Sequence, residues 1–221
     1  GNSIWFTATD AGQVDLWRAS RKVGTQFWWE NREFTLEQMT QDSHVESRLT
    51  FTPDGKSLLL QQGRGDLVVL DLETNQKRTL VRGFSSLDFD VSPDGQWVAY
   101  SQQDNDFNSE IWITPISGES RAVNVSRHPD NEGSPKFSPD GKILAFTGRR
   151  SDDERDVYYV YLNQADDQQT SRQRRIEEAL ELMRKERKTT AEQPSEESSD
   201  SKSETAANSQ DTKPAQQEDS D

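Results

Sequence analysis

Two histidines are the side chains in this 221-residue chain best suited to general acid–base catalysis, because imidazole titrates near neutral pH. His44 lies in the segment Gln41-Asp-Ser-His-Val45, and His128 lies within residues 124–137. A serine nucleophile would need such a base, oriented by an acid. Neither histidine is accompanied by a recognisable serine–acid arrangement, and Gly-x-Ser-x-Gly, His-Glu-x-x-His and Gly-x-Gly-x-x-Gly motifs are absent. We therefore expect loop histidines and no catalytic residue.

Clustered carboxylates could act as an acid–base pair or bind a cation. Asp104 and Asp106, and the run 152–154, fall on expected hairpin tips, where nothing would desolvate one carboxyl group and raise its pKa. Three Asp-Gly pairs could suggest calcium, but the spaced ligands Asp-x-Asp-x-Asp-Gly are missing around all of them. The chain has no cysteine, which excludes thiolate metal sites and disulfides. We expect no metal site and no cofactor.

The three Asp-Gly pairs belong to one hexapeptide that occurs in three near-copies. These are Phe51-Thr-Pro-Asp-Gly-Lys56, Val91-Ser-Pro-Asp-Gly-Gln96 and Phe137-Ser-Pro-Asp-Gly-Lys142. The prolines stand at positions 53, 93 and 139, so the spacings are 40 and 46 residues. Repeats of this length are typical of propellers in which each repeat forms one four-stranded blade.

The sequence Pro-Asp-Gly favours a turn, because proline fixes φ near the value that the turn needs, aspartate hydrogen-bonds the local backbone and glycine accepts a positive φ. Apolar, strand-like residues flank each copy and continue after a polar turn, which predicts two successive hairpins in each repeat. The expected strands that follow the hexapeptides include residues 58–60 and 67–72, 97–100 and 111–113, and 143–146 and 157–162.

Residues 4–6 and 14–17 match the same template without its Pro-Asp-Gly hairpin. We therefore predict an all-β fold of about four blades over residues 1–162, the first blade truncated, forming part of a six- or seven-bladed ring. Such a partial ring leaves two apolar blade faces uncovered. We expect the chain to be a fragment of a longer protein and, alone, to associate or aggregate.

The residues after the blades differ in character. Residues 163–188 read as a linker and an amphipathic helix from Thr170 to about Lys188, with Ile176, Leu180 and Met183 on one face. Residues 189–221 contain no Ile, Leu, Val, Met or aromatic residue, and nine acidic residues against two lysines give a net charge of −7. Because so little apolar surface can be buried there, we expect a disordered acidic segment.

The overall charge restricts the possible partners. A net charge of −14 argues against nucleic acid and anionic membranes, which both require a basic surface. No apolar run approaches 18 residues, so we expect no membrane span. The six tryptophans are predicted to pack between blades. The adjacent pair Trp28-Trp29 would point to opposite faces if extended, which makes it the favoured surface contact.

Two segments contain longer versions of the hexapeptide, namely Ser92-Pro-Asp-Gly-Gln-Trp-Val-Ala-Tyr-Ser101 and Phe137-Ser-Pro-Asp-Gly-Lys-Ile-Leu-Ala-Phe146. Both resemble the Pro-Asp (WD40-like) repeat of TolB, dipeptidyl-peptidase-like and tricorn propellers. The stretch Asp156-Val-Tyr-Tyr-Val-Tyr-Leu162, running into Thr170-Ser-Arg-Gln-Arg-Arg-Ile-Glu-Glu-Ala-Leu180, is more particular. It looks like the charged insertion in a propeller of bacterial tricorn-like serine proteases. The resemblance covers roughly residues 1–188.

This resemblance implies a non-catalytic portion of a cytoplasmic tricorn-type peptidase, from its second, seven-bladed propeller. Family members carry two propellers, a PDZ domain and a core that supplies the Ser–His catalytic machinery. No position of this chain matches the catalytic motif of that core. The implied partners are peptides or unfolded segments, the remaining blades and protease domains of the parent chain, and further copies of the full-length protein.

Two alternatives remain open: a TolB-like, non-enzymatic binding propeller of the periplasm, and the regulatory propeller of a prolyl-oligopeptidase-type hydrolase. The neighbouring sequence would discriminate among the three. A PDZ domain and serine-protease core select tricorn, a secretion signal and an upstream α/β domain select TolB, and a Gly-x-Ser-x-Gly hydrolase domain selects the third.

Overall fold

The computed structural model describes residues 2–10, 12–22, 27–150 and 154–191. The chain divides into two compact units, Gly1–Gln169 and Thr170–Asp221. The first unit holds all the β-strands described, and the second holds the long helix.

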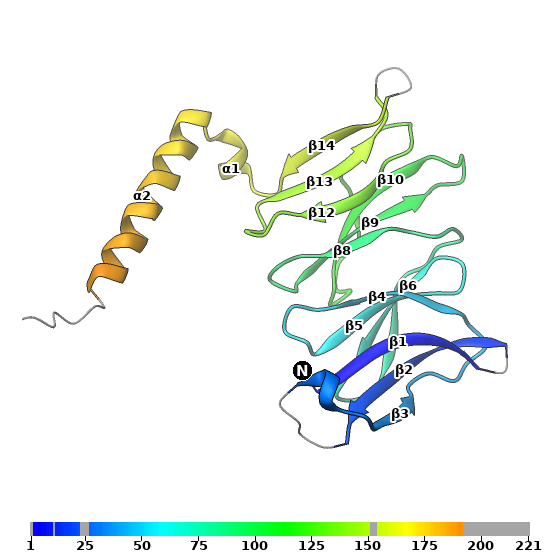
Figure 1. Cartoon of the computed structure of the whole chain (residues 1–221). Coiled ribbons are helices and arrows are strands. Elements are labelled where there is room, and N and C mark those ends of the chain that lie inside the picture. Colours follow the sequence, from blue (N-terminus) through cyan, green and yellow to red (C-terminus); the bar gives the residue numbers. More distant parts are fainter. Residues whose placement is uncertain (1, 11, 23–26, 151–153, 192–221) are drawn as a thin grey trace, which may run out of the picture. The chain divides into compact units, whose positions relative to one another are not determined.

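Four antiparallel sheets follow one another along the first unit, which confirms the predicted all-β blades (Figure 1). In each sheet the spatial order of the strands equals their order in the chain, as in a meander. The first sheet contains β1 (Ser3–Asp10), β2 (Gln13–Arg21) and β3 (Phe34–Gln38). The second contains β4 (Glu46–Phe51), β5 (Ser57–Gln62), β6 (Asp66–Asp71) and β7 (Lys77–Val81).

The third sheet contains β8 (Phe89–Val91), β9 (Trp97–Gln103), β10 (Ser109–Pro115) and β11 (Val123–Asn124). The fourth contains β12 (Gly133–Phe137), β13 (Ile143–Gly148) and β14 (Asp156–Tyr161). Among the described residues, the first and fourth sheets therefore have three strands where the middle two have four. Each Pro-Asp-Gly sequence links the first two strands of its sheet, as predicted.

The hydrophobic core lies between successive sheets, because alternate residues of a strand face opposite sides. Leu58 and Leu60 pack toward the first sheet with Leu16, whereas Leu59 packs toward the third sheet with Val98. A third cluster joins the last two sheets and consists of Ala99, Ile111, Leu144 and Phe146. Each sheet is thus stabilised by burial against its neighbours.

The prediction that the tryptophans form the inter-blade core is mostly wrong. Trp5 and Trp112 pack at the margins of the clusters, but aliphatic residues and Tyr100 fill their centres. Trp97 and Trp29 are 39% and 78% exposed. Trp29 lies in a short turn and Trp97 is the first residue of its strand, so neither stands in the middle of a strand that packs between sheets.

Trp28 and Trp29 are not extended, because they form a short 3₁₀ turn, η1 (Trp28–Glu30). The two indoles nevertheless have different neighbours. Trp29 stacks on Phe27 with ring centroids 4.4 Å apart, and Trp28 stacks on Phe34 at 5.7 Å. The exposed Trp29 agrees with the expectation that one indole of the pair is on the surface.

Two helices follow the last strand. In the first unit, α1 (Gln164–Gln168) begins at Asn163, whose side chain accepts a hydrogen bond from the Ala165 backbone N–H at 2.9 Å. In the second unit, α2 (Ser171–Ala191) corresponds to the predicted helix, with Thr170 and Gln173 forming a reciprocal cap at its start. Within the described residues, no helix is both long enough and apolar enough to span a membrane. Residues 189–191 of the predicted acidic segment 189–221 belong to α2, and the rest of that segment lies outside the described residues.

Candidate functional site

The Pro-Asp-Gly aspartates are bonded within their own turns. Asp54 Oδ1 accepts hydrogen bonds from the Thr52 hydroxyl at 2.6 Å and from the Lys56 backbone N–H at 3.0 Å. The same pattern recurs for Ser92 with Asp94 and for Ser138 with Asp140. The glycines at 55, 95 and 141 have φ of 69°, 72° and 70°, which explains why glycine is used. The repeated aspartates therefore build turns, as predicted.

Successive turns also contact one another. A β-carbon placed on Gly95 would lie 3.4 Å from Pro53 Cδ, and one on Gly141 would lie 3.9 Å from Pro93 Cδ. The proline of one blade thus packs against the turn glycine of the next. This contact adds a second reason why the hexapeptide is repeated.

The turns keep their carboxylates ionised. In each turn the hydroxyl donor lowers the pKa of the aspartate below its ordinary value of 3.8, and the backbone N–H of the residue two positions later adds to this effect. A carboxyl group with a lowered folded-state pKa stabilises the fold above its unfolded pKa, and this contribution is lost as the pH falls through the folded pKa.

Replacing all three aspartates by asparagine (D54N, D94N, D140N) should therefore reduce the sensitivity of the fold to acid. We expect the thermal midpoint of the wild type to fall between about pH 4 and pH 2, and that of the triple variant to fall less. Circular dichroism melts across this range would measure the difference. As a control, D106N removes an exposed carboxylate outside these turns and should follow the wild type. Coincident profiles of triple variant and wild type would contradict the prediction.

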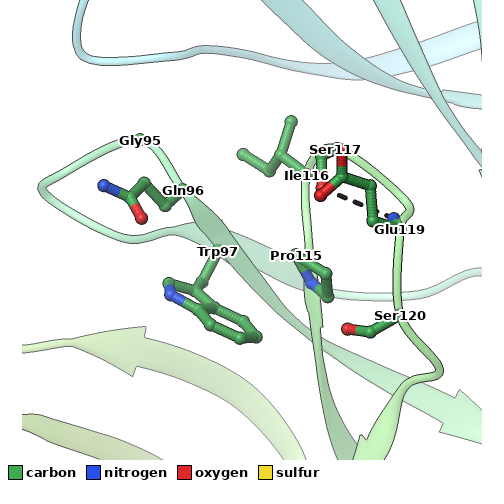
Figure 2. Close-up of a pocket in the computed structure, with 8 residues that line it drawn as sticks. All are labelled: Gly95, Gln96, Trp97, Pro115, Ile116, Ser117, Glu119 and Ser120. Carbon is green, nitrogen blue, oxygen red and sulfur yellow. Dashed lines mark hydrogen bonds between the residues drawn. The ribbon is translucent and has the colours of Figure 1, made fainter.

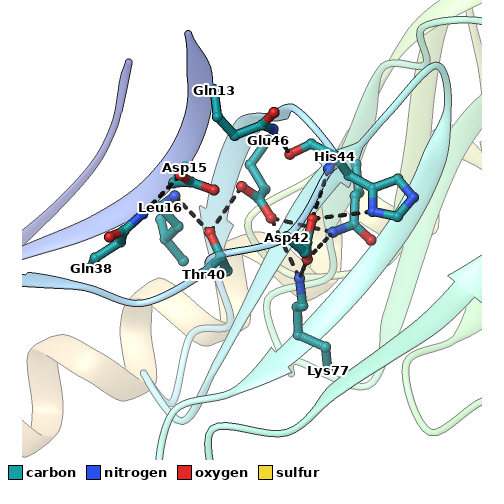
Figure 3. A network of polar contacts seen from close by, with 10 residues as sticks. Gln13, Asp15, Leu16, Gln38, Thr40, Asp42, His44, Glu46 and Lys77 are labelled. Carbon is teal, nitrogen blue, oxygen red and sulfur yellow. Dashed lines mark hydrogen bonds and ion pairs between the residues drawn. The ribbon is translucent and has the colours of Figure 1, made fainter. Parts of the chain in front are cut away.

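His44 belongs to a polar network between the first and second sheets (Figure 3). Its Nδ1 lies 3.1 Å from Asp42 Oδ1, which also accepts the His44 backbone N–H at 2.9 Å. Asp42 in turn pairs with Lys77. Burial opposes ionisation of Asp42, but hydrogen bonds from Lys77 and His44 outweigh it and lower the Asp42 pKa. His44 thus contacts a structural carboxylate, as expected for a loop histidine.

Glu46 is the buried centre of this network, 1% exposed. Its Oε2 accepts from the Thr40 hydroxyl at 2.9 Å, and the same hydroxyl oxygen accepts the Leu16 backbone N–H of β2 at 2.8 Å. Its Oε1 lies 3.2 Å from Gln62 Nε2 and 3.4 Å from Lys77 Nζ. Burial raises the Glu46 pKa, and the bonds from Thr40 and Lys77 oppose this rise. Thr40 and Glu46 together bridge two sheets.

A related arrangement joins the third and fourth sheets, where the Glu132 backbone N–H donates a hydrogen bond to the Ser109 carbonyl of β10 at 2.7 Å. Ser126 accepts the Ile111 backbone N–H at 3.0 Å, and the buried Glu132 pairs with Arg150 at 3.1 Å. His128 Nδ1 lies 3.8 Å from Glu132 Oε1 and, among the described residues, has no hydrogen-bond partner. Burial, followed by the nearby Asp104 and Glu132 charges, raises the Glu110 pKa.

These buried glutamates were missed in the sequence, although a signal existed. Glu46 and Glu132 each stand seven residues before the proline of their repeat, and Thr40 and Ser126 each stand thirteen before it. The middle repeat has Ser86 at the glutamate position, whose hydroxyl donates to Gln61 Oε1 at 3.2 Å. The regularity is thus visible in only two copies.

The other predicted carboxylates do not converge. Asp104 caps its own turn by accepting backbone N–H groups of Asp106 and Asn108, both at 2.9 Å. Asp152 and Asp153 lie outside the described residues, and Glu154 is exposed. In the described ranges, no group of three or more His, Asp or Glu side chains is placed to hold a metal ion.

The first strands of the last three sheets line a cavity of about 290 Å³. Arg48, Asp88 and Ser134, each five residues before its repeat proline, contribute to the lining together with Lys136. Asp88 pairs with Arg48, and Lys136 pairs with Asp90 at 2.7 Å. Arg48 and Ser134 have positive φ values of 53° and 52°, at irregularities in their strands. This cavity brings both signs of charge to one polar surface.

Trp97 lines two further cavities, each of about 520 Å³. In the first, Figure 2 shows the Trp97 indole beside Pro115, with Ile116, Ser117, Glu119 and Ser120 on the adjoining loop. The second lies between the third and fourth sheets, and Val123, Phe137 and Leu162 provide its apolar lining. Trp97 is therefore an exposed aromatic residue that contributes to the lining of both cavities.

Comparison with known proteins finds relatives among peptidases, although no known protein-family profile matches the chain. A tricorn protease homolog of Saccharolobus solfataricus is 29% identical over 105 residues, covering 47% of this chain and 10% of the relative. A tricorn-like protease C-terminal subunit of Sulfurisphaera tokodaii is 25% identical over 122 residues, covering 54% and 14%. Dipeptidyl-peptidase 5 of Aspergillus oryzae is 29% identical over 110 residues, covering 42% and 15%. The chain therefore spans about a tenth to a seventh of these relatives.

Solved propeller structures share the fold. TolB of Acinetobacter baumannii superposes with a TM-score of 0.56 at 19% identity, covering 74% of this chain and 39% of that one. The tricorn protease superposes with a TM-score of 0.55 at 14% identity, covering 73% and 17%. At such identities the likeness concerns the fold alone. The chain is thus homologous over part of its length to tricorn protease homologs and dipeptidyl peptidases, and its four sheets are propeller blades.

Proposed function

We propose that this chain is the non-catalytic β-propeller portion of a bacterial tricorn-like serine peptidase, which scaffolds the enzyme and channels or filters peptides for proteolysis. The observation that carries the proposal is the similarity to tricorn protease homologs over about half of the chain, in a chain that folds as blades. The proposal gives the chain no catalytic, cofactor-binding or metal-binding residue.

The hydrogen bonds and ion pairs of the candidate residues support the non-catalytic assignment. Glu46 joins two sheets through Thr40. His44 and Lys77 contact Asp42, and the repeat aspartates are bonded inside their turns. Side chains already engaged in such structural contacts are poorly placed to transfer protons to a substrate. One surface available to a passing peptide is the cavity lined by the first strands of the last three sheets, where Asp88, Arg48 and Lys136 present charged side chains.

The proposed organisation has blades over residues 1–162, a linker and helix over 163–188, and an acidic segment over 189–221. The complete ring would have six or seven blades, with the missing blades and the protease domains supplied by the parent chain. The parent is proposed to be cytoplasmic and to form homo-oligomers.

Two measurements test the assignment. The coding sequence on both sides should encode further blades, a PDZ domain and a serine-protease core. A fluorophosphonate probe should label a serine in the product of the whole reading frame, but no residue of the present chain, which should also hydrolyse no peptide. A secretion signal with an upstream α/β domain would instead favour the TolB-like role, and peptide hydrolysis by this chain would overturn the non-catalytic assignment.

The uncovered face of the fourth sheet provides a further prediction. Val157 and Tyr159 of β14 are 71% and 61% exposed, and apolar area of this kind favours association. We expect the chain to associate with rising concentration in sedimentation velocity, and Val157→Lys with Tyr159→Glu to shift it toward the monomer. Phe107→Glu, on a turn of the third sheet, removes a comparably exposed ring as control. A wild type that stays monomeric would contradict the expected open ring.

A further inference from the structure

Two consecutive junctions between sheets differ at one equivalent strand position. In the second sheet Leu59 pairs with Val69, which pairs with Arg78 of β7. In the third sheet Ala99 pairs with Ile113, which pairs with Val123 of β11. Leu59 and Ala99 both stand six residues after their repeat proline. Arg78 and Val123 therefore occupy the same place in successive blades.

Arg78 closes the junction between the second and third sheets. Its Nη2 donates a hydrogen bond to the Ile116 backbone carbonyl of the third sheet. A β-carbon on Gly118 would lie only 2.8 Å from Arg78 Nη1, so this glycine leaves room for the guanidinium group. The Ile116 backbone N–H bonds the Gln96 carbonyl at 2.8 Å, which fixes the accepting loop.

The next junction lacks this arginine. Leu162 takes the place of Ile116, because its backbone N–H bonds the Lys142 carbonyl at 2.9 Å, and Gln96 and Lys142 both stand three residues after their repeat proline. Opposite it stands Val123, which is 52% exposed and carries no donor. The junction consequently holds an open groove of about 520 Å³.

The lining of this groove is complementary to a cation attached to an apolar segment. Its charged members are two carboxylates, Asp94 and Asp140, and its lining contains no lysine or arginine. Trp97 adds an exposed indole, which attracts a guanidinium group through its ring face. Val123, Phe137 and Leu162 supply apolar contact area beside these groups.

We propose that the groove between the third and fourth sheets binds a peptide segment through an arginine side chain, whose guanidinium takes the place that Arg78 fills at the preceding junction. The apolar residues next to that arginine pack against Val123 and Phe137. The proposal rests on the proposed function, since it names the kind of peptide that this propeller engages. The groove lies between two sheets that are both present, so it needs no further blade.

The test uses the full chain and the fluorescein-labelled peptide Gly-Gly-Leu-Arg-Leu-amide. Fluorescence anisotropy should show saturable binding, and replacing the arginine by citrulline, which is neutral and of similar shape, should weaken it at least about tenfold. Val123→Arg should abolish binding without lowering the thermal midpoint, because the new side chain can donate to Leu162 as Arg78 donates to Ile116. Val45→Arg, at an exposed valine ahead of β4, is the matched control and should bind like the wild type.

Equal binding of the arginine and citrulline peptides, or unchanged binding by Val123→Arg, would overturn the proposal. Self-association that Val123→Arg alone removes would overturn it in favour of a second copy as the occupant. These outcomes are independent of the serine-labelling experiment, which tests the parent peptidase. If the groove does not bind the peptide, the assignment of the parent protein as a peptidase is still decided by the serine-labelling experiment.

Discussion

Gly65→Ala is expected to lower the free energy of unfolding by about 2–3 kcal/mol, the range for forcing atoms into a packed site. Gly65 lies in the turn between β5 and β6, where a β-carbon would lie 2.1 Å from the Ser85 carbonyl oxygen. A β-carbon on Gly83 would likewise lie 2.6 Å from the Gly65 carbonyl oxygen. Two backbone segments therefore meet without intervening side chains, and neither can move aside by a rotamer change. Urea denaturation would measure the loss.

Gly133→Ala is the matched control, because a β-carbon there would meet nothing closer than Asp88 Oδ2 at 3.8 Å. We expect this variant to unfold within about 1 kcal/mol of the wild type, as for ordinary surface substitutions. Equal losses for both variants would mean that the close approach of residues 65 and 85 does not contribute to stability.

The hairpin around each Pro-Asp-Gly sequence could be predicted because the residues that specify it are neighbours in the chain. Pro53, Asp54 and Gly55 specify a turn by their own backbone preferences, and the apolar runs on either side alternate as strands do. The outermost strands were not individually recognised. Lys77–Val81 is largely polar and Val123–Asn124 has only two residues, so neither carries a periodic pattern. Their existence follows from pairing with β6 and β10, which is tertiary information.

The polar features were harder to foresee, for two different reasons. Glu46 and Glu132 keep a constant spacing to their repeat prolines, so a comparison of the repeats beyond the hexapeptide would have found them. The equivalence of Arg78 and Val123 could not be found in this way. The connection after Gln62 is shorter than the connection after Gln103, so only the strand pairing aligns the two positions.

Removing the Glu46 carboxyl group is expected to be the most damaging change to the polar network. Glu46→Ala should lower the free energy of unfolding by about 3 kcal/mol, because it leaves a cavity and deprives the buried Thr40 hydroxyl of its acceptor. Lys77 would keep only Asp42 of its two carboxylate partners. Chemical denaturation at neutral pH measures this loss. Glu33→Ala, which breaks an exposed pair with Lys22, is the control and should cost less than about 0.5 kcal/mol.

Glu46→Gln separates the shape of this side chain from its charge. The amide keeps an acceptor for Thr40, so the loss should be less than half of that for alanine. Burial raises the Glu46 pKa, which means that ionising this group opposes folding as the pH rises from its unfolded pKa through its folded pKa. Relative to the wild type, Glu46→Gln should therefore gain stability between about pH 4 and pH 7. A relative stability that instead falls over this range would contradict the prediction and show that the ion pair between Glu46 and Lys77, within the second sheet, outweighs the cost of burying the charge.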